Sequence, residues 1–438
     1  MHPHHPERPM DPNEPRPADP ARRRWLRSLG ALPVLAALPQ LPAIARAVPA
    51  PAAATGLARG GLDGMRARFA LAGTHINGAF MHPVGHASAA ALQRYLDGRL
   101  MNRAGQGVNL MEDRAHAMKQ FARLVNADID ELAWVPSTMA GENHVVSGLG
   151  LPGSRARVVT DAYHFSGSLF MYNELAKQGL DLQVVRPRDN RIQLDDLDRA
   201  ITPGTRLVAL SLVSNVNGFE HDLKAVCDLA HARGALVYAD LIQAAGTVPI
   251  DLHASGVDFA ACSTYKWLMG DFGIGLMYVR RDSLPALRRS QWGYRQEQEF
   301  VTHLYPFDPP GEQPLETAPR TDTPGRVEVG TLGYAGVAML SASLDLLLEL
   351  GVERIQAWRQ PLLQRLQQAL PALGYLPMTP AGSRSPIVTF AARGVEKRLA
   401  ARFADAGVEA TLYPDRIRIS PSFYNDIDDI ERLIALCG

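Results

Sequence analysis

The sequence contains little cysteine and carries no excess of charge of either sign. Only three of its 438 residues are cysteines, and Cys227, Cys262 and Cys437 show neither CxxC nor metal-ligand spacing. We therefore expect no disulfide framework and no metal site. Basic and acidic residues number 45 each, so the net charge is zero. Bulk charge thus gives no reason to expect a nucleic acid or an anionic membrane as a partner.

The sequence also lacks an apolar run long enough to span a membrane. The apolar stretch 28–41 is interrupted by proline and is shorter than the roughly twenty residues that a spanning helix needs. It follows RRRWLR at 22–27, which resembles the twin-arginine export motif, and small residues lie at 45–47. We expect residues 1–47 to be a signal peptide, rather than merely a disordered basic tail. The protein is then expected to travel folded through the twin-arginine export machinery and to be periplasmic or secreted.

The rest of the sequence alternates between short apolar segments and segments with helical periodicity, after a linker and N-terminal arm at 48–74. The predicted strands are 132–136, 157–160, 182–185, 207–212, 236–239, 258–263 and 274–279. This alternation predicts an α/β fold with a mostly parallel seven-stranded sheet and helices on both faces. We assign 75–334 to this large domain and 335–438 to a smaller C-terminal α+β domain. Proline and charge rise over 283–325, and 306–324 is expected to be a long loop.

One lysine ends a predicted strand that is otherwise apolar. Burying the Lys266 ammonium would be costly, unless the amine is neutral and bound to a carbonyl as a Schiff base. The structural alternative is a lysine that reaches the surface. Asp240 ends a nearly uncharged strand just upstream, and a buried carboxylate needs a partner. A protonated pyridine nitrogen would supply that partner, so the two residues together indicate pyridoxal phosphate as the cofactor.

Other polar residues also fall where predicted strands end, the edge at which ligands bind in open α/β sheets. The segment 137–142 lies between a strand and a helix, whose first N–H groups suit a phosphate. An imidazole such as that of His164 can stack on a planar ring, and Asn215 and Gln243 can reach a ring oxygen. Ser263 and Tyr265 carry hydroxyls beside the lysine. Each of these taken alone has an ordinary structural explanation as a cap, turn or surface residue.

Taken together, these segments resemble the class V aminotransferase family of fold-type I enzymes, which includes cysteine desulfurases, kynureninase and isopenicillin-N epimerases. The resemblance covers roughly residues 77–436. It implies a fold-type I pyridoxal phosphate-dependent transferase fold. The matching segments are 138–143, His164, Ser214 to Gly218, Asp240-x-x-Gln243, Ser263-x-Tyr265-Lys266, Arg326-x-Glu328-x-Gly330-Thr331 and Arg418-Ile419-Ser420.

The resemblance implies a role for each matching residue around the cofactor. Lys266 would carry it as a Schiff base, His164 would stack on its ring and Asp240 would pair with the ring nitrogen. The ring oxygen would contact Asn215 and Gln243. The phosphate would be held by Thr138, Met139 and Ala140 together with Ser263 and Tyr265.

The resemblance also implies how substrate and a second subunit meet the site. Arg418 would bind the substrate carboxylate through its bidentate guanidinium, and Asn77 would lie on the substrate side. Thr331 would enter the site of the other subunit, so a homodimer with shared active sites is expected.

Two departures from the family narrow the expected activity. Desulfurases need a cysteine shortly before the carboxylate-binding arginine, and this chain has none between Cys262 and Cys437. Tyr265 replaces the histidine that often precedes the lysine, as in kynureninase-like members. We expect an aminotransferase or epimerase acting on a small-molecule or peptide amine. The alternatives are a kynureninase-like Cβ–Cγ hydrolase and a non-catalytic binding protein. Export combined with this fold also resembles the periplasmic enzymes that tailor peptide siderophores such as pyoverdine.

Overall fold

The computed structural model describes residues 62, 64–101 and 110–438. These residues belong to a compact unit that extends from Arg59 to Gly438. The predicted signal peptide, 1–47, and most of the predicted linker lie outside the described residues.

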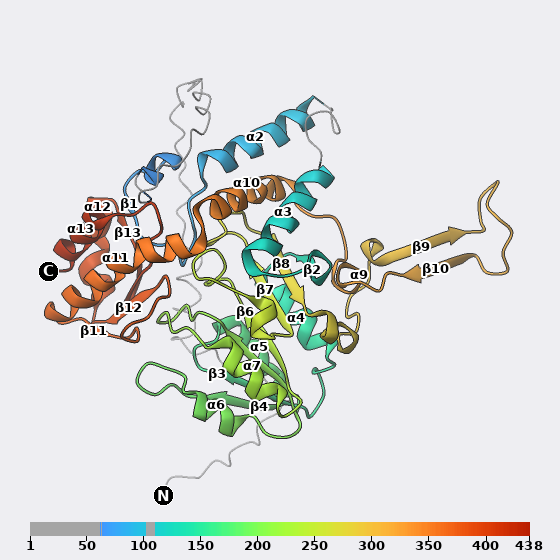
Figure 1. The fold of residues 1–438 in the computed structure, drawn as a ribbon, viewed down its shortest axis with the longest axis horizontal. Helices are drawn as coiled ribbons and strands as arrows, with labels where there is room; N and C mark the ends of the chain where they lie inside the picture. Colours follow the sequence, from blue (N-terminus) through green and yellow to red (C-terminus); the bar gives the residue numbers. More distant parts are fainter. Residues whose placement is uncertain (1–61, 63, 102–109) are drawn as a thin grey trace, which may run out of the picture. The chain divides into compact units, whose positions relative to one another are not determined.

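A seven-stranded sheet forms the centre of this unit (Figure 1). Its order is β2-β8-β7-β6-β5-β3-β4; β8 is antiparallel to its two neighbours and the other pairs are parallel. The strands are β2 (Leu132–Val135), β3 (Arg157–Asp161), β4 (Asp181–Val185), β5 (Thr205–Ser211), β6 (Leu236–Asp240), β7 (Phe259–Ser263) and β8 (Gly275–Val279). Each coincides with a predicted strand, so the predicted fold class is confirmed.

The strands bury both of their faces because successive side chains point to opposite sides of the sheet. In β6, Val237 and Ala239 enter one apolar cluster and Tyr238 enters another. The first cluster includes side chains of α3 (Leu110–Val125), α7 (Leu223–His231) and α10 (Tyr334–Leu350). The second includes side chains of α4 (Thr138–Gly148) and α5 (Ser166–Ala176).

The C-terminal region builds a separate core over a four-stranded antiparallel sheet. The sheet order is β11 (Leu376–Pro377), β12 (Val388–Ala391), β15 (Arg416–Ile419) and β14 (Thr411–Tyr413). Its helices are α11 (Val352–Ala372), α12 (Val395–Ala406) and α13 (Ile427–Cys437). The N-terminal arm joins this region through β1 (Thr74–His75), which pairs with β13 (Val408–Glu409), and through a bridge between Asn77 and Ser420. The arm therefore brings Asn77 next to the strand that carries Arg418.

The predicted long loop at 306–324 is only partly correct. It contains β10 (Leu315–Pro319), which pairs antiparallel with β9 (Glu297–Thr302), and the start of α9 (Thr323–Val327). The hairpin projects away from the rest of the unit (Figure 1). Its strands are almost entirely exposed, so the burial pattern that reveals a core strand is missing from their sequence.

The remaining elements connect or cover these regions. They are α2 (His86–Leu100), α6 (Leu194–Ala200), α8 (Leu252–Ser255), and the 3-10 helices η1 (Met65–Arg68), η2 (Ile129–Glu131), η3 (Arg281–Ala286) and η4 (Tyr294–Gln296). Among the described residues, no single helix has the length and hydropathy of a membrane span. Helices α10 and α11 reach those values only as a pair, which bends by 75° between them.

Candidate active site

The predicted site residues meet where the parallel strands β5, β6 and β7 end. Ser211 is the last residue of β5 and lies in register with Asp240, the last residue of β6. Asp240 in turn pairs with Ala261 in β7, two residues before Ser263. The carboxyl edge of the sheet therefore gathers residues that are widely separated in the sequence, as expected for a ligand site in an open α/β fold.

The amine of Lys266 is buried without a partner. The residue is 8% exposed, and no described residue forms a hydrogen bond or ion pair with its Nζ. Its nearest aromatic neighbour is the ring of Tyr265, whose centroid lies 5.8 Å from Nζ. Burial lowers the pKa of Lys266 to about 8 against the opposing attraction of Asp240, and Arg418 lowers it further. About a tenth of the amine is therefore neutral and nucleophilic at pH 7, far more than for an ordinary lysine with its pKa of about 10.4.

Asp240 is a buried carboxylate with one hydrogen bond from the backbone. Its Oδ1 accepts from the N–H of Ile242 at 2.8 Å, and the residue is 3% exposed. Burial raises the pKa of Asp240 to about 6, although that hydrogen bond and the nearby His164 and Lys266 oppose the rise. A cationic N–H at this position would satisfy the carboxylate, which is the role that a protonated pyridine nitrogen plays.

The start of α4 is fastened to the end of β7 by a reciprocal pair of hydrogen bonds. The N–H of Thr138 donates to Ser263 Oγ at 2.7 Å, and the N–H of Ser263 donates to Thr138 Oγ1 at 2.8 Å. A Cβ at Gly141 would lie 2.6 Å from the Cβ of Ala261, so only glycine lets the helix approach this closely. The result is a helix N-terminus with two hydroxyls at the edge of the sheet, as a phosphate site requires.

One of the other predicted phosphate contacts is not a free donor, because the chain already uses it. The N–H of Ala140 donates to Oγ of the N-cap residue Ser137 at 3.1 Å. The ring of Tyr265 stacks on Phe272 with centroids 4.5 Å apart. Met139 lies in the first turn of α4, and its sulfur lies 3.4 Å from Ser168 Oγ.

His164 is held at both ring nitrogens. Its Nδ1 lies 2.9 Å from Ser211 Oγ and its Nε2 lies 3.1 Å from Glu142 Oε1. Burial lowers the pKa of His164, but the negative charges of Glu142, Asp240 and Asp161 outweigh burial and leave the pKa raised. The role of Glu142 was not predicted from the sequence. The available signal was an acidic side chain on a helix that is buried against the sheet.

Gln243 and Asn215 form hydrogen bonds with other residues of the chain, and these bonds are not predicted from the sequence. The amide of Gln243 donates to the carbonyl of Ala79 at 2.9 Å and accepts from the indole N–H of Trp267 at 2.8 Å. It thereby links the segment that follows β1 to the segment that carries Lys266. Asn215 is half-buried, and its main-chain carbonyl accepts from Arg418 Nη1 at 3.1 Å.

Arg418 is a buried guanidinium without a carboxylate partner among the described residues. Besides the bond to Asn215, its Nη2 donates to Thr411 Oγ1 at 3.1 Å, while its Nε is buried and unpaired. The hydroxyl of Thr411 donates to Asn77 Oδ1 at 2.5 Å, so Asn77 supports the arginine through Thr411. Burial lowers the pKa of Arg418. A buried, unpaired guanidinium beside a reactive amine is suited to an anion such as a substrate carboxylate.

Thr331 lies apart from these buried residues. It is exposed, and its hydroxyl lies 2.6 Å from the hydroxyl of Tyr294, at the base of the β9–β10 hairpin. The nearby Glu328 is buried and forms an ion pair with Arg114 at 2.5 Å. The Arg326-to-Thr331 motif thus contains a structural acid followed by an exposed threonine.

The three cysteines are all buried and free. Burial raises the pKa of Cys227 to about 12 and that of Cys437 to about 11, and it raises the pKa of Cys262 further. Thiols in such surroundings are poor nucleophiles.

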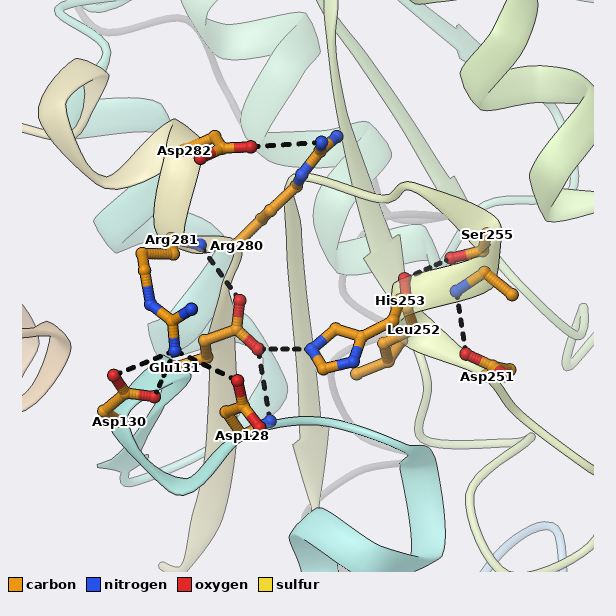
Figure 2. Close-up of polar contacts among 11 residues, drawn as sticks. Asp128, Asp130, Glu131, Asp251, Leu252, His253, Ser255, Arg280, Arg281 and Asp282 are labelled. Atoms are coloured by element: carbon orange, nitrogen blue, oxygen red, sulfur yellow. Dashed lines mark hydrogen bonds and ion pairs between the residues drawn. The ribbon is translucent and has the colours of Figure 1, made fainter.

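A second charged cluster, which we call the amino-edge cluster, lies at the opposite edge of the same sheet, just before β2 begins and just after β8 ends. Figure 2 shows its polar contacts. The cluster consists of Asp128, Asp130, Glu131, His253 and Arg281. Glu131 immediately precedes β2 and accepts hydrogen bonds from His253 Nε2 at 2.7 Å, from the N–H of Arg281 at 3.0 Å and from the N–H of Asp128 at 3.2 Å. The guanidinium of Arg281 contacts Asp128 and Asp130 at 3.0 Å.

Ligand atoms of Asp128, Glu131 and His253 lie within 4.8 Å of one another, as they would around a metal ion. Arg281 already supplies the positive charge that such an ion would bring, and each acceptor oxygen of Glu131 already has a protein donor. We therefore interpret the amino-edge cluster as structural.

Comparison with known proteins places this chain in a family. Residues 102–433 match the model of the family described as aminotransferase class-V. A cysteine desulfurase from Klebsiella pneumoniae is 28% identical over 336 residues, which cover 72% of this chain and 80% of the relative. A probable cysteine desulfurase from Methanothermobacter thermautotrophicus is 30% identical over 241 residues, or 55% of this chain, and the match spans only 57% of that relative.

Solved structures share the same fold. The cysteine desulfurase CsdA from Escherichia coli superposes with a TM-score of 0.73 at 24% identity, covering 85% of this chain and 96% of that one. The cystine C–S lyase C-DES, solved with its product cysteine persulfide, has a TM-score of 0.71 at 20% identity, with 84% and 98% covered.

Proposed function

Because this chain belongs to the class V aminotransferase family, we propose that it acts on the α-amino group of an amino acid or aminoacyl compound, by aminotransfer or epimerisation. Its cofactor is pyridoxal phosphate, and the residues at the carboxyl edge fit that group. The observation that carries the proposal is the presence at this edge of two buried basic groups, Lys266 and Arg418, that have no carboxylate partner among the described residues. One is a nucleophile of lowered pKa, and the other is a site for a carboxylate.

Each residue of the site then has a definite task. When bound, pyridoxal phosphate draws electrons away from the substrate Cα and so makes the α-proton acidic. Asp240 would keep the ring nitrogen protonated, and the start of α4 with Ser263 would hold the phosphate. Arg418 fixes the substrate carboxylate, and Lys266 takes the α-proton as a general base. Thr411 and Asn77 orient Arg418 by their hydrogen bonds.

Sulfur transfer is the activity named for several relatives, but the cysteines of this chain do not support it. The three thiols are buried with raised pKa values, and none lies on a segment shortly before Arg418. We do not extend the desulfurase activity to this chain for that reason. Lyase chemistry, which the name of C-DES gives for that protein, is an outcome that the experiment below would detect as pyruvate.

We also propose that the active protein is a homodimer. The projecting hairpin carries exposed apolar side chains at Phe300, Leu304, Tyr305 and Leu315. A lone two-stranded ribbon is marginally stable in water, so this one needs a surface to pack against. Thr331 is hydrogen-bonded to the base of the same hairpin, which supports its predicted place in the other subunit's site. Sedimentation of the purified protein as a monomer at micromolar concentration would contradict this proposal.

Export and a peptide substrate complete the proposed function. The RRRWLR segment and the apolar stretch after it support translocation by the twin-arginine route, with cofactor already bound. Siderophore peptides are the extracellular amine substrates that we propose for this location. The test is to replace Arg22, Arg23 and Arg24 by lysine: the mature protein should then remain in the cytoplasm. Activity on free amino acids but never on aminoacyl peptides would count against the peptide substrate.

The reaction is tested by loading the purified protein with pyridoxal phosphate and adding amino acids and aminoacyl peptides. We expect a visible absorption band of the bound cofactor, its conversion by substrate, and the formation of the corresponding 2-oxo acid. Lys266→Ala should abolish all three signals. The matched control is Lys224→Ala, which removes an exposed lysine paired with Asp228. Absence of the band in the wild-type protein would refute the proposed function.

A further inference from the structure

The imidazole of His164 has no free nitrogen. The contacts of Nδ1 with Ser211 and of Nε2 with Glu142 use both atoms through which an imidazole can give or take a proton. Both side chains of the Glu142–His164 pair are fully buried. The imidazole is therefore held by its edge, and only its ring faces are left for contact with another planar group.

A residue of a third element, helix α5, also holds the side chain of Glu142 in place. Its Oε2 accepts a hydrogen bond from Ser168 Oγ in α5 at 2.5 Å, while its Oε1 faces His164. Contacts from α4, α5 and β5 thus determine the orientation of one ring. A buried carboxylate bound in this way stabilises a charged imidazole and resists its rotation.

The groups that face His164 come from several elements, and most carry negative charge or none. Glu142, Asp240 and Asp161 all act to keep its proton. Asp161 also contacts His221 Nε2 at 3.2 Å, and the ring of Tyr172 lies 6.5 Å from the imidazole. The proton on Nε2 is thus retained by its surroundings and is poorly placed for transfer to a substrate.

We propose that Glu142 is a positioning residue that fixes His164 as a stacking surface and excludes it from proton transfer, so that Lys266 is the proton carrier of the reaction. The inference rests on the proposed function. It deepens that function because epimerisation needs a proton carrier on each face of the substrate, whereas aminotransfer needs a carrier on one face only. With His164 stacked on one face of the bound cofactor, that face would be filled, and the amine of Lys266 would act from the other.

The consequence for the chemistry is a single active face. Lys266 Nζ accepts the proton as the Cα–H bond breaks, and the electron pair remains on the substrate and cofactor. The same amine would return the proton on the same face, to Cα with retention of configuration. Bound pyridoxal phosphate would supply a second carbon that can take this proton, which is the route to aminotransfer. Hydrolysis then releases a 2-oxo acid, and a second 2-oxo acid accepts the amino group. Inversion at Cα would need an acid on the face that His164 covers.

The experiment combines stereochemistry with magnetic resonance of the histidine. In deuterated buffer without an acceptor, the wild-type protein should exchange the α-proton of an L-amino acid without producing the D-enantiomer. Accumulation of the D-enantiomer at a rate comparable to exchange would overturn the proposal. Absence of exchange with every substrate and no cofactor band would instead refute the proposed function, so the two failures are distinguishable.

The second measurement uses the imidazole of His164 in the cofactor-free protein, so it does not depend on activity. Glu142→Gln should lower the pKa of His164 by about 1 to 3 units, the usual effect of removing an opposite charge in contact. The matched control is Glu131→Gln, which alters a buried glutamate that is hydrogen-bonded to His253 and should leave the pKa of His164 unchanged (Figure 2). An unchanged pKa in Glu142→Gln would overturn the positioning role. If that variant fails to fold, the nitrogen shifts of His164 in the wild-type protein decide: a free, unprotonated Nε2 at neutral pH contradicts the proposal.

Discussion

The two edges of the central sheet each contain a buried glutamate bonded to a histidine, and they differ in what surrounds that pair. At the amino edge, each charged group of the amino-edge cluster has a partner within the chain, because Arg281 contacts Asp128 and Asp130 while Glu131 receives three donors (Figure 2). At the carboxyl edge, Glu142 and His164 are paired with each other, but Lys266 and Arg418 are unmatched, since no described residue supplies either with a carboxylate partner. The difference separates a structural cluster from a site that a ligand must complete.

The largest expected effect follows from removing the unmatched amine. Lys266→Ala should abolish cofactor capture and turnover, because no other described lysine is buried at the edge where Asp240 lies. Absorption spectra of the loaded protein and product analysis measure both. If the comparison between the edges is sound, Arg281→Ala at the amino edge should reduce stability but leave the cofactor band intact. Normal turnover by Lys266→Ala would remove the basis of the comparison.

The next effect concerns the unmatched guanidinium. Arg418→Ala should lower kcat/KM by roughly 30-fold or more, since truncating one partner of a buried charge pair costs about 2 to 5 kcal/mol. The cofactor band should persist, because Arg418 meets the substrate rather than the cofactor. Steady-state kinetics with an amino acid and with its carboxamide check this result. A carboxamide that wild-type and variant enzymes convert equally well supports the role, whereas an equal loss on both substrates contradicts it.

The pH dependence of cofactor capture should reflect the titration of Asp240 and of Lys266. Asp240, with its pKa raised to about 6, must lose its proton to pair with a protonated ring nitrogen. Lys266, with its pKa lowered to about 8, must lose its proton to attack a carbonyl. The rate of capture should therefore rise with pH from about 6 and level off above about 8. In Asp240→Asn the part of the rise that begins near pH 6 should disappear. A pH profile unchanged by that substitution would exclude Asp240 from the site.

Stability should distinguish the two glutamate–histidine pairs. The pKa of His164 is raised on folding, so its contribution is fully present below the ordinary value of about 6.5 and is lost as pH rises through the folded value. Glu142→Gln should cost about 3 kcal/mol at pH 6 and less at higher pH. Glu131→Gln should lose at most about 1 kcal/mol from its ion pair, because His253 is partly exposed. Denaturant unfolding at several pH values compares them, and equal costs would contradict the distinction.

The smallest expected effect is that of removing the thiols. Replacing Cys227 and Cys437 by alanine should leave turnover within about twofold. Truncating a buried side chain away from the active site changes the stability of the fold rather than the chemistry of the site. Assays of 2-oxo acid and of sulfide measure the result. Loss of sulfide release in the variant would show that a thiol takes part and that the chain is a desulfurase after all.

Much of the fold and part of the site follow from sequence patterns, for identifiable reasons. The seven core strands are predictable because apolar runs mark strands that are buried on both faces. The positions of Asp240, Ser263 and Lys266 follow from strand ends that share one edge of the sheet. The hairpin was missed because its exposed strands lack that signal.

Side-chain partners were the least predictable feature. Gln243 contacts Ala79 and Trp267, and Glu142 contacts His164 and Ser168, through pairings that only the packing of distant segments determines. Sequence reasoning could identify a polar residue at the correct edge of the sheet. It could not tell whether that residue faces a ligand or another part of the chain.

The most direct test of the central claim is to map the lysine that holds the cofactor. The protein is loaded with pyridoxal phosphate, the bond between cofactor and lysine is reduced with borohydride, and the modified peptide is identified by mass spectrometry. Because Lys266 is the buried amine that the chain leaves unmatched, we predict that Lys266 carries the label and that Asp240→Asn weakens the labelling. Labelling of an exposed lysine such as Lys224 or Lys177 instead, or no labelling at all, would contradict the account.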